Sequence, residues 1–122
     1  MTINKAIETV DRLKPNAYSL EEKMRWLSEL DGQISEEILA PMRGGAAPFE
    51  PYDPMEDGDV ELIAEGVYAD IYIKYLCAQI DYHNGEWNRY NNSAAMYQAS
   101  WDLYASYMRR QHKPETGAKI LI

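Results

Sequence analysis

The feature that most constrains this chain is a recurrence of apolar side chains at helical spacing. Thr2 is a candidate N-cap, and the apolar residues behind it repeat every three or four positions: Ile3, Ala6, Ile7, Val10 and Leu13. Ser19 and Glu22 form a capping-box pair that opens a second apolar stripe: Leu20, Met24, Leu27, Leu30, Ile34 and Ile38. Pro41 and Gly44 are expected to close this second helix.

The helical period returns in the second half of the chain. A third helix is predicted from Glu65 or Gly66 to about Tyr90, with these residues on one face: Leu76, Ile80, His83, Trp87 and Tyr90. Asn84-Gly85 is typical of a turn, but the period runs through it and favours a continuous helix. A fourth helix is predicted over 94–111, with Asn92 or Ser93 as its cap.

The fourth predicted helix is apolar on two sides. One side carries Tyr97, Trp101, Tyr104 and Met108, and the other carries Met96, Leu103 and Tyr107. A helix with two apolar sides needs two partners, and one of them can be another subunit.

Residues 42–59 contain three prolines and three glycines and show no helical period. Segments 49–52 and 60–64 are candidates for a short β-hairpin, since apolar and polar residues alternate in the second of them. Between positions 42 and 66 there are seven acids and one base, so this region carries −6 of the net charge of −8. We therefore predict an all-α, four-helix domain over 1–112 with a long acidic loop at 42–59 and an extended tail at 113–122.

Residues with catalytic or ligand-binding potential are scattered. Cys77 lies mid-helix, where a small buried thiol is expected, and His83 and His112 are 29 positions apart. The acidic stretch 53–59 fails the calcium-loop pattern because Met55 and Ala64 occupy ligand positions. We predict no enzyme, no metal site and no cofactor, with loose divalent-ion binding by the loop as the alternative.

Ten tyrosines, three tryptophans and one phenylalanine give the chain an unusual aromatic content. Tyrosine and tryptophan combine an apolar body with a polar tip, which suits half-buried surfaces and subunit interfaces; the alternative is a small core built from tyrosine. The polar cluster at 84–93 is either a specific interface or a capped turn. No apolar run approaches the roughly 20 residues of a membrane span, so we expect a soluble protein made in a cytoplasm.

Two stretches resemble small proteins encoded by prophages of the Firmicutes type. The first comprises Leu13-Lys14-Pro15-Asn16-Ala17-Tyr18-Ser19, Glu21, Lys23, Trp26-Leu27-Ser28 and Leu30-Asp31-Gly32. The second comprises Tyr72-Ile73-Lys74-Tyr75-Leu76, Gln79-Ile80-Asp81-Tyr82, Asn84-Gly85-Glu86 and Arg89-Tyr90-Asn91-Asn92-Ser93. Such proteins resemble the head–tail connector (adaptor, or head-completion) family of long-tailed bacteriophages. The resemblance covers nearly the whole chain except 42–59.

The resemblance implies a structural protein of the virion, located at the head–tail junction and made in the host bacterial cytoplasm. It implies a ring of about a dozen copies that joins the portal protein to a tail-side completion protein. DNA is expected to pass through without sequence-specific binding, because an acidic lining does not hold phosphate. The family has no catalytic residues to transfer. The alternative is a soluble helical interaction or regulatory protein encoded by a prophage.

The predicted interface residues fall into three groups along the chain: Phe49, Tyr52, Asp57 and Asp59; Glu86, Trp87, Arg89 and Tyr90; and Arg109, Arg110, Lys119, Ile120, Leu121 and Ile122. Four bases and one acid give 109–122 a charge of +3, so the acidic loop of one subunit is predicted to contact the basic end of the next. The three terminal aliphatic residues either fold back onto the core or add a strand to a neighbour's sheet edge.

Overall fold

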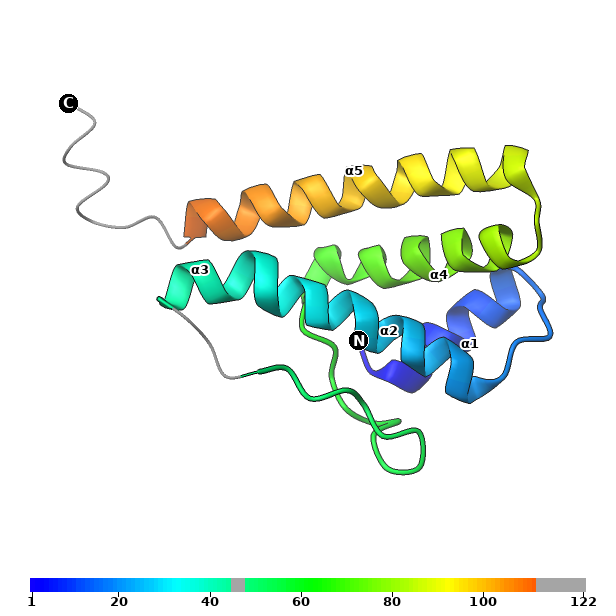
Figure 1. Ribbon diagram of the computed structural model, residues 1–122, viewed down its shortest axis with the longest axis horizontal. Helices are drawn as coiled ribbons and strands as arrows, with labels where there is room; N and C mark the ends of the chain where they lie inside the picture. The colour runs from blue at the N-terminus through cyan, green and yellow to red at the C-terminus, as the bar shows by residue number, and fades with distance from the viewer. Residues whose placement is uncertain (45–47, 112–122) are drawn as a thin grey trace.

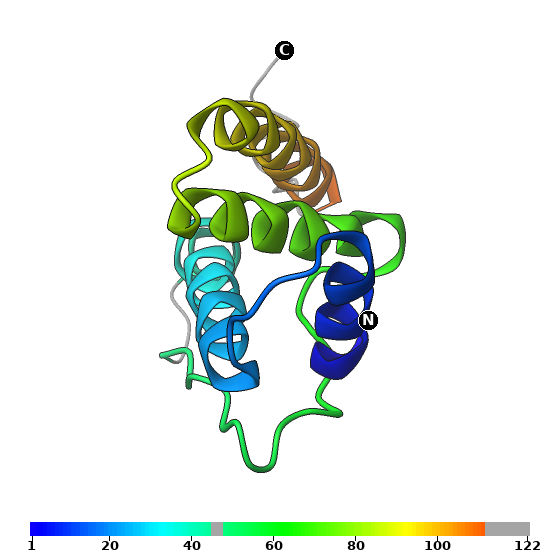
Figure 2. The same ribbon diagram turned by 90° about the vertical axis from the view of Figure 1, so that its right-hand side faces the viewer.

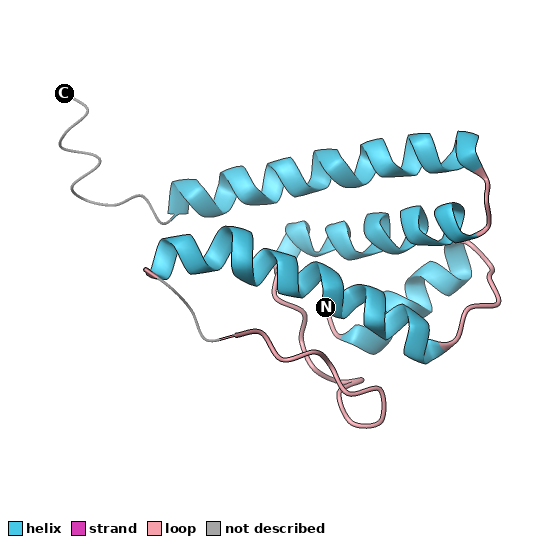
Figure 3. Ribbon diagram, in the orientation of Figure 1, coloured by secondary structure: helices cyan, strands magenta, loops and turns pink. Residues whose placement is uncertain are grey.

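A computed structural model describes residues 1–44 and 48–111, and these ranges form an all-α fold, as predicted. Figure 3 shows only helices and loops among the described residues. The elements are α1 (Ile3–Leu13), α2 (Leu20–Ile34), the π-helical turn η1 (Ser35–Leu39), α3 (Ala40–Arg43), the 3₁₀ turn η2 (Gly66–Ala69), α4 (Asp70–His83) and α5 (Trp87–Gln111). None of the helices in these ranges is long and apolar enough to cross a membrane.

The helices stack in layers around α4 (Figures 1 and 2). α5 lies along one side of α4, and α1 and α2 lie on the other side. Buried side chains from these helices form one core, whose largest fully buried members include Trp26, Leu27, Leu30, Tyr72, Leu76 and Ile80. Because α4 is covered on both sides, it is the central element of the fold.

The predicted starts of the first two helices are confirmed. The Thr2 hydroxyl accepts a hydrogen bond from the Lys5 amide at 3.1 Å, and the Ser19 hydroxyl accepts one from the Glu22 amide at 3.1 Å. Each bond satisfies an N-terminal amide that has no partner within its helix. The sequence signals are therefore sufficient to locate both helix starts.

The prediction that Pro41 closes the second helix is wrong. The helical path continues through η1 and α3 to Arg43, and Gly44 ends it in the left-handed conformation at φ 71°. Pro41 has no amide hydrogen to donate to the preceding turn, and the wide π-turn just before it accommodates this loss. The Gly44 part of the prediction is correct.

The predicted hairpin between 49–52 and 60–64 does not occur in the described residues. Instead, Glu61 forms an isolated antiparallel bridge with Thr2. The Ile3 amide donates to the Val60 carbonyl at 3.1 Å, and the Asn4 amide donates to the Gly58 carbonyl at 2.9 Å. The first amides of α1 have no acceptors within their helix, so the loop carbonyls provide them.

A buried carboxylate connects the acidic loop to the core. Asp31 of α2 is fully buried and accepts hydrogen bonds from the Tyr52 hydroxyl at 2.5 Å, the Tyr72 hydroxyl at 2.5 Å and the Ile63 amide at 3.1 Å. Burial raises the pKa of Asp31 above its ordinary value, and the three hydrogen bonds oppose that rise. The Tyr72 hydroxyl also accepts a bond from the Ala64 amide at 2.7 Å. Asp31 therefore joins α2, α4 and both ends of the loop.

The third predicted helix ends earlier than expected. α4 stops at His83, Gly85 adopts a left-handed φ of 71°, and α5 begins at Trp87. The fourth predicted helix therefore starts seven residues earlier than position 94, and neither Asn92 nor Ser93 caps it. Ser93 lies inside α5, where its hydroxyl donates to Asp81 at 2.8 Å. The reversal lets α5 pack along α4, which buries apolar surface that a continuous helix would leave exposed.

Candidate functional site: the aromatic surface at the α4–α5 turn

Six aromatic side chains from four parts of the chain meet beside the α4–α5 turn. We call them the aromatic surface: Tyr18, Trp26, Tyr82, His83, Trp87 and Tyr90. Tyr18 comes from the α1–α2 linker, Trp26 from α2, Tyr82 and His83 from the end of α4, and the last two from the start of α5. These rings form a continuous series that runs from the core to the exterior.

The inner end of the aromatic surface is anchored on Trp26. This indole is fully buried, and the His83 ring stacks on it with centroids 5.1 Å apart and planes at 9°. Tyr18 meets Trp26 edge-on at 5.4 Å. His83 is exposed, and its ring covers one face of the buried indole. The stack holds the end of α4 in a fixed position relative to α2.

The outer end is centred on Tyr82. Its ring makes edge contacts with His83 at 5.2 Å, Tyr90 at 5.4 Å and Trp87 at 5.6 Å. Tyr82 is 48% exposed and Trp87 is 57% exposed. Large aromatic rings that contact one another and remain open to solvent have the composition typical of a protein–protein binding hot spot.

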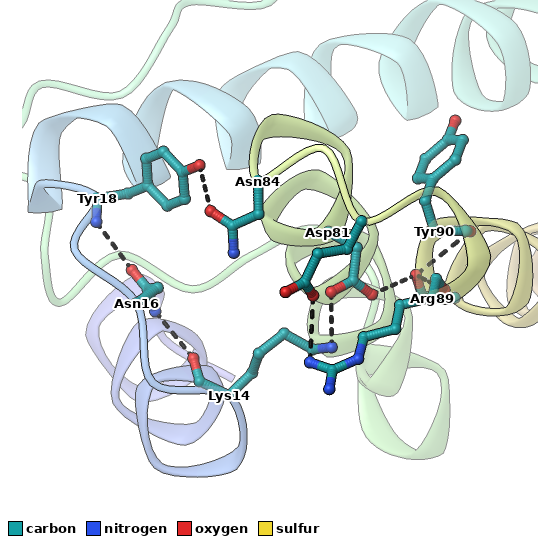
Figure 4. Close-up of polar contacts among 9 residues, drawn as sticks. Lys14, Asn16, Tyr18, Asp81, Asn84, Arg89 and Tyr90 are labelled. Carbon is teal, nitrogen blue, oxygen red and sulfur yellow. Dashed lines mark hydrogen bonds and ion pairs between the residues drawn. The ribbon is translucent and has the colours of Figure 1, made fainter.

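Hydrogen bonds fix the α1–α2 linker against this turn (Figure 4). The Tyr18 hydroxyl donates to Asn84 Oδ1 at 2.6 Å, and the Tyr18 amide donates to Asn16 Oδ1 at 3.1 Å. Asn16 Nδ2 in turn donates to the Lys14 carbonyl at 3.1 Å. The linker therefore presents Tyr18 in a single orientation.

An ion pair between a buried carboxylate and a partly buried lysine supports the same region. Asp81 is buried, and its carboxylate accepts from Lys14 Nζ at 2.8 Å and from the Ser93 hydroxyl at 2.8 Å (Figure 4). These three residues belong to α4, the linker after α1, and α5. Removing one partner from such a pair leaves a buried charge unbalanced, so the pair ties the three elements together.

A buried lysine stabilises the linker itself. Lys23 of α2 is buried, and its ammonium group donates to Asp11 at 2.7 Å and to Asn16 Oδ1 at 3.2 Å. Asn16 Nδ2 also donates to Asp11 at 2.9 Å. The sequence Lys14-Pro15-Asn16 is thus held at both ends by charged partners.

One group of predicted interface residues lies together at this site. Trp87 and Tyr90 belong to the aromatic surface, and Glu86 and Arg89 form an ion pair at its edge with Nη1–Oε2 of 3.1 Å. This pair is exposed, and exposed pairs contribute little to stability. A charged edge around an aromatic centre is the usual arrangement of a binding interface.

The loop group is located elsewhere and has structural contacts of its own. Tyr52 binds Asp31, and the Phe49 ring lies against Gly32, where an added Cβ would be 3.4 Å from the ring. Asp57 accepts from the Asp53 amide at 2.7 Å, and Asp59 is exposed. Two of the four predicted loop residues therefore serve mainly to hold the loop on the core.

The third group is divided by the limits of the described chain. Arg109 and Arg110 are exposed at the far end of α5. Twenty-five residues at 1.5 Å each make α5 about 37 Å long, so these arginines are far from Trp87. The remaining members, Lys119, Ile120, Leu121 and Ile122, lie outside the described residues, and the contact between loop and tail stays a prediction.

Sequence reasoning missed the two buried carboxylates. Asp31 had a detectable signal, because it follows Leu27 by four positions and precedes Ile34 by three, and so lies within the apolar stripe of α2. An acid in that position needs hydrogen-bond donors from elsewhere in the chain. The donors are a tyrosine from the loop and one from α4, and no local pattern identifies them.

Metal-ligating and nucleophilic side chains are the other candidates for chemistry among the described residues. Among them there is no cluster of three or more His, Cys, Asp or Glu side chains that would hold a metal ion. Burial raises the pKa of the Cys77 thiol, which keeps it protonated and weakly nucleophilic near neutral pH.

No protein-family model, no curated protein and no solved structure matches the chain.

Proposed function

We propose that this chain is an assembly subunit that joins the portal to the tail of a long-tailed bacteriophage, as a ring around the DNA passage. The observation that carries the proposal is the half-exposed pair Tyr82 and Trp87, whose rings are in edge contact on the aromatic surface. The connector role itself comes from the sequence resemblance. Its proposed neighbours are copies of itself, the portal protein and a tail-side completion protein.

The first supporting step is the energetics of Trp87. Its indole is 57% exposed, and it contacts the Tyr82 ring from the first residue of α5. A partner that covers these rings gains apolar burial without having to order them first. Such a surface favours binding to a partner over the free monomer.

The second step concerns the outer side of α5. This helix packs on α4, with its C-terminal part also near η1 and η2. Leu103 is 66% exposed and Met96 is also exposed, so most of the predicted second apolar side is not covered by the described residues. Tyr107 differs, because its ring stacks on Tyr68 with centroids 4.4 Å apart.

The third step is the separation of the candidate contacts. The aromatic surface and the exposed arginines Arg109 and Arg110 lie at opposite ends of α5. Two different surfaces at two ends suit a head-to-tail contact between copies, which closes into a ring when the rotation permits. The net charge of −8 suits a passage for DNA, since few basic groups would hold its phosphates.

The proposal is tested with Trp87→Ala in a mixture with the cognate portal protein. We expect the unchanged chain to form portal-bound rings in electron micrographs, and the variant to lose most of them while its helical circular dichroism is unaltered. Glu8→Ala, at an exposed position on α1, is the matched control and should assemble normally.

Two results would contradict the proposal. One is assembly of the Trp87→Ala variant with the portal as efficiently as the unchanged chain. The other is absence of the protein from purified virions by quantitative mass spectrometry. A small oligomer that forms in solution but is missing from virions would favour the regulatory alternative.

A further inference from the structure

A groove of about 880 Å³ lies beneath the C-terminal end of α5. Its volume is in the range of sites that hold a drug-sized ligand or a few side chains. Its walls come from η1, the segment after the acidic loop and the last turns of α5, and include Leu39, Leu62, Val67, Tyr68, Tyr104 and Tyr107. The groove is distant from the aromatic surface, because it lies at the other end of α5.

The lining of the groove combines apolar and aromatic side chains with Ser35, Glu61 and Glu65. The stacked rings of Tyr68 and Tyr107 make one side of it, and Tyr104 lies near Tyr68 with centroids 6.0 Å apart. Val67 at its edge is 83% exposed. An isolated valine at the surface is ordinary, but a valine beside fixed aromatic rings and Leu39 forms part of a continuous apolar lining.

We propose that the C-terminal residues Ile120, Leu121 and Ile122 bind in this groove of their own chain. The wall of the groove includes Met108, and the last described residue, Gln111, is less than one helical turn beyond it. Eleven residues follow Gln111. Fully extended they would reach at most about 36–40 Å, which is ample for a return to the groove.

The sequence of the segment suits this path. Pro114 has no amide hydrogen and disfavours helix, and Gly117 is compatible with a reversal of direction just before the aliphatic residues. Lys119 precedes Ile120, and Glu61 and Glu65 line the groove. The segment therefore offers three aliphatic side chains to an apolar lining and a cation to its acidic edge.

Proximity favours binding within one chain over binding to a neighbour. A short connection gives the segment an effective concentration in the millimolar range, about a hundredfold above a protein concentration of 10 µM. The inference does not depend on the proposed function, since a connector and a regulator would both have this groove.

Disulfide trapping in the full chain tests the inference. In a Cys77→Ser background, Val67→Cys is combined with Leu121→Cys, and the product is analysed under non-reducing conditions at about 10 µM protein, where intramolecular trapping dominates if the segment is docked. We expect a cross-linked monomer of altered mobility. The control pairs Leu121→Cys with Ser106→Cys, an exposed position near the same end of α5 but on the face opposite Tyr104 and Met108.

The control pair should give little cross-link. A second comparison uses a different cysteine pair, Val67→Cys with Ile122→Cys, with and without Leu121→Asp. The aspartate should reduce the cross-link by about tenfold or more relative to the same pair without it, because a buried charge is unfavourable beside the aliphatic lining. Cross-linked dimers would show that the segment binds a neighbouring copy and would overturn the inference. Equal trapping by both pairs, or trapping by neither, would overturn it as well.

Discussion

Replacing Tyr72 by phenylalanine should destabilise the fold more than the same change at Tyr52. Both hydroxyls donate to the buried Asp31 carboxylate at 2.5 Å. The Tyr72 hydroxyl has a second role, because it accepts a hydrogen bond from the Ala64 amide at 2.7 Å. Tyr52→Phe therefore removes one bond, whereas Tyr72→Phe removes one bond and leaves a second group without a partner.

The expected magnitudes follow from these contacts. A hydrogen bond to a charged group contributes about 1.5–3 kcal/mol, and a buried amide without a partner costs about 1–3 kcal/mol. Tyr72→Phe should thus lower the free energy of unfolding by about 2.5–6 kcal/mol. Tyr52 is only half-buried, so its loss should cost about 1.5 kcal/mol, near the lower limit for such a bond. Against a typical total of about 5–15 kcal/mol, the first change brings the fold close to its limit.

Urea denaturation followed by circular dichroism measures both changes. We expect the midpoint to fall for each variant while the slope with urea stays constant, since the unfolded surface is the same. Asp31→Asn serves as the reference for a double-mutant cycle, because it removes the charge that both hydroxyls serve. In that background, Tyr72→Phe should cost less than in the unchanged chain.

Equal costs for Tyr52→Phe and Tyr72→Phe, within about 0.5 kcal/mol, would refute the assigned role of the Ala64 amide, because coupled residues typically show larger interaction energies. A cycle with no coupling to Asp31 would refute the carboxylate as the common acceptor. Either result would mean that α2, the loop and α4 are joined by packing alone.

Three further predictions concern the turn, the buried ion pair and the tyrosines. Gly85→Ala should lower the free energy of unfolding by about 1 kcal/mol, seen as a lower thermal midpoint, because an L side chain is strained at φ 71°. Lys14→Met should cost about 3 kcal/mol in urea denaturation, because it leaves the buried Asp81 carboxylate with the Ser93 hydroxyl and no counter-charge, and Asp81→Asn should recover part of the loss. Burial raises the pKa of Tyr72 above its usual range and that of Tyr104 to about 12, so each contributes stability that is present below pH 10 and is lost at about 1.4 kcal/mol per pH unit as the pH rises toward 12. Circular dichroism against pH checks this loss, and a midpoint in urea that stays constant between pH 10 and 12 would contradict it.

Local signals account for the parts of the fold that the sequence predicts well. Thr2 and Ser19 cap their helices with their own hydroxyls, and the stripes behind them contain most of the buried apolar residues of α1 and α2. Leu13 and Leu20 of the predicted stripes are exposed, and the buried Trp26 lies outside them. These features depend on neighbours within four positions, so they are visible in the sequence. The left-handed Gly44 is a signal of the same local kind.

Non-local pairing explains the failed hairpin. Polar and apolar residues alternate in segment 60–64, which is typical of a strand. This segment does form backbone hydrogen bonds. Its partner is the N-terminus, through Thr2 and Ile3, rather than the adjacent 49–52 segment. The first amides of α1 need acceptors outside their helix, and the carbonyls of this segment provide them. No sequence pattern within the loop predicts that pairing.

The candidate site was predicted in part for the same reason. Glu86, Trp87, Arg89 and Tyr90 are close in sequence and share one turn, so their proximity is a local property. Tyr18 reaches the same place from about 65 residues away through its bond to Asn84. That contact depends on how α1 and α2 pack against α4, which the sequence pattern does not specify.

The break at Asn84-Gly85 creates both the core and the candidate site. A continuous helix would place His83 and Trp87 one turn apart on one face, and α4 would lose the cover that α5 provides. With Gly85 in the left-handed conformation, α5 reverses along α4, Ser93 reaches Asp81, and Tyr82 becomes the centre of the aromatic contacts. The apolar residues that continued the helical period past the turn therefore serve a different purpose, since Trp87 stays largely exposed. A residue that extends an apolar period but is not needed to complete a core is a candidate for contact with a partner.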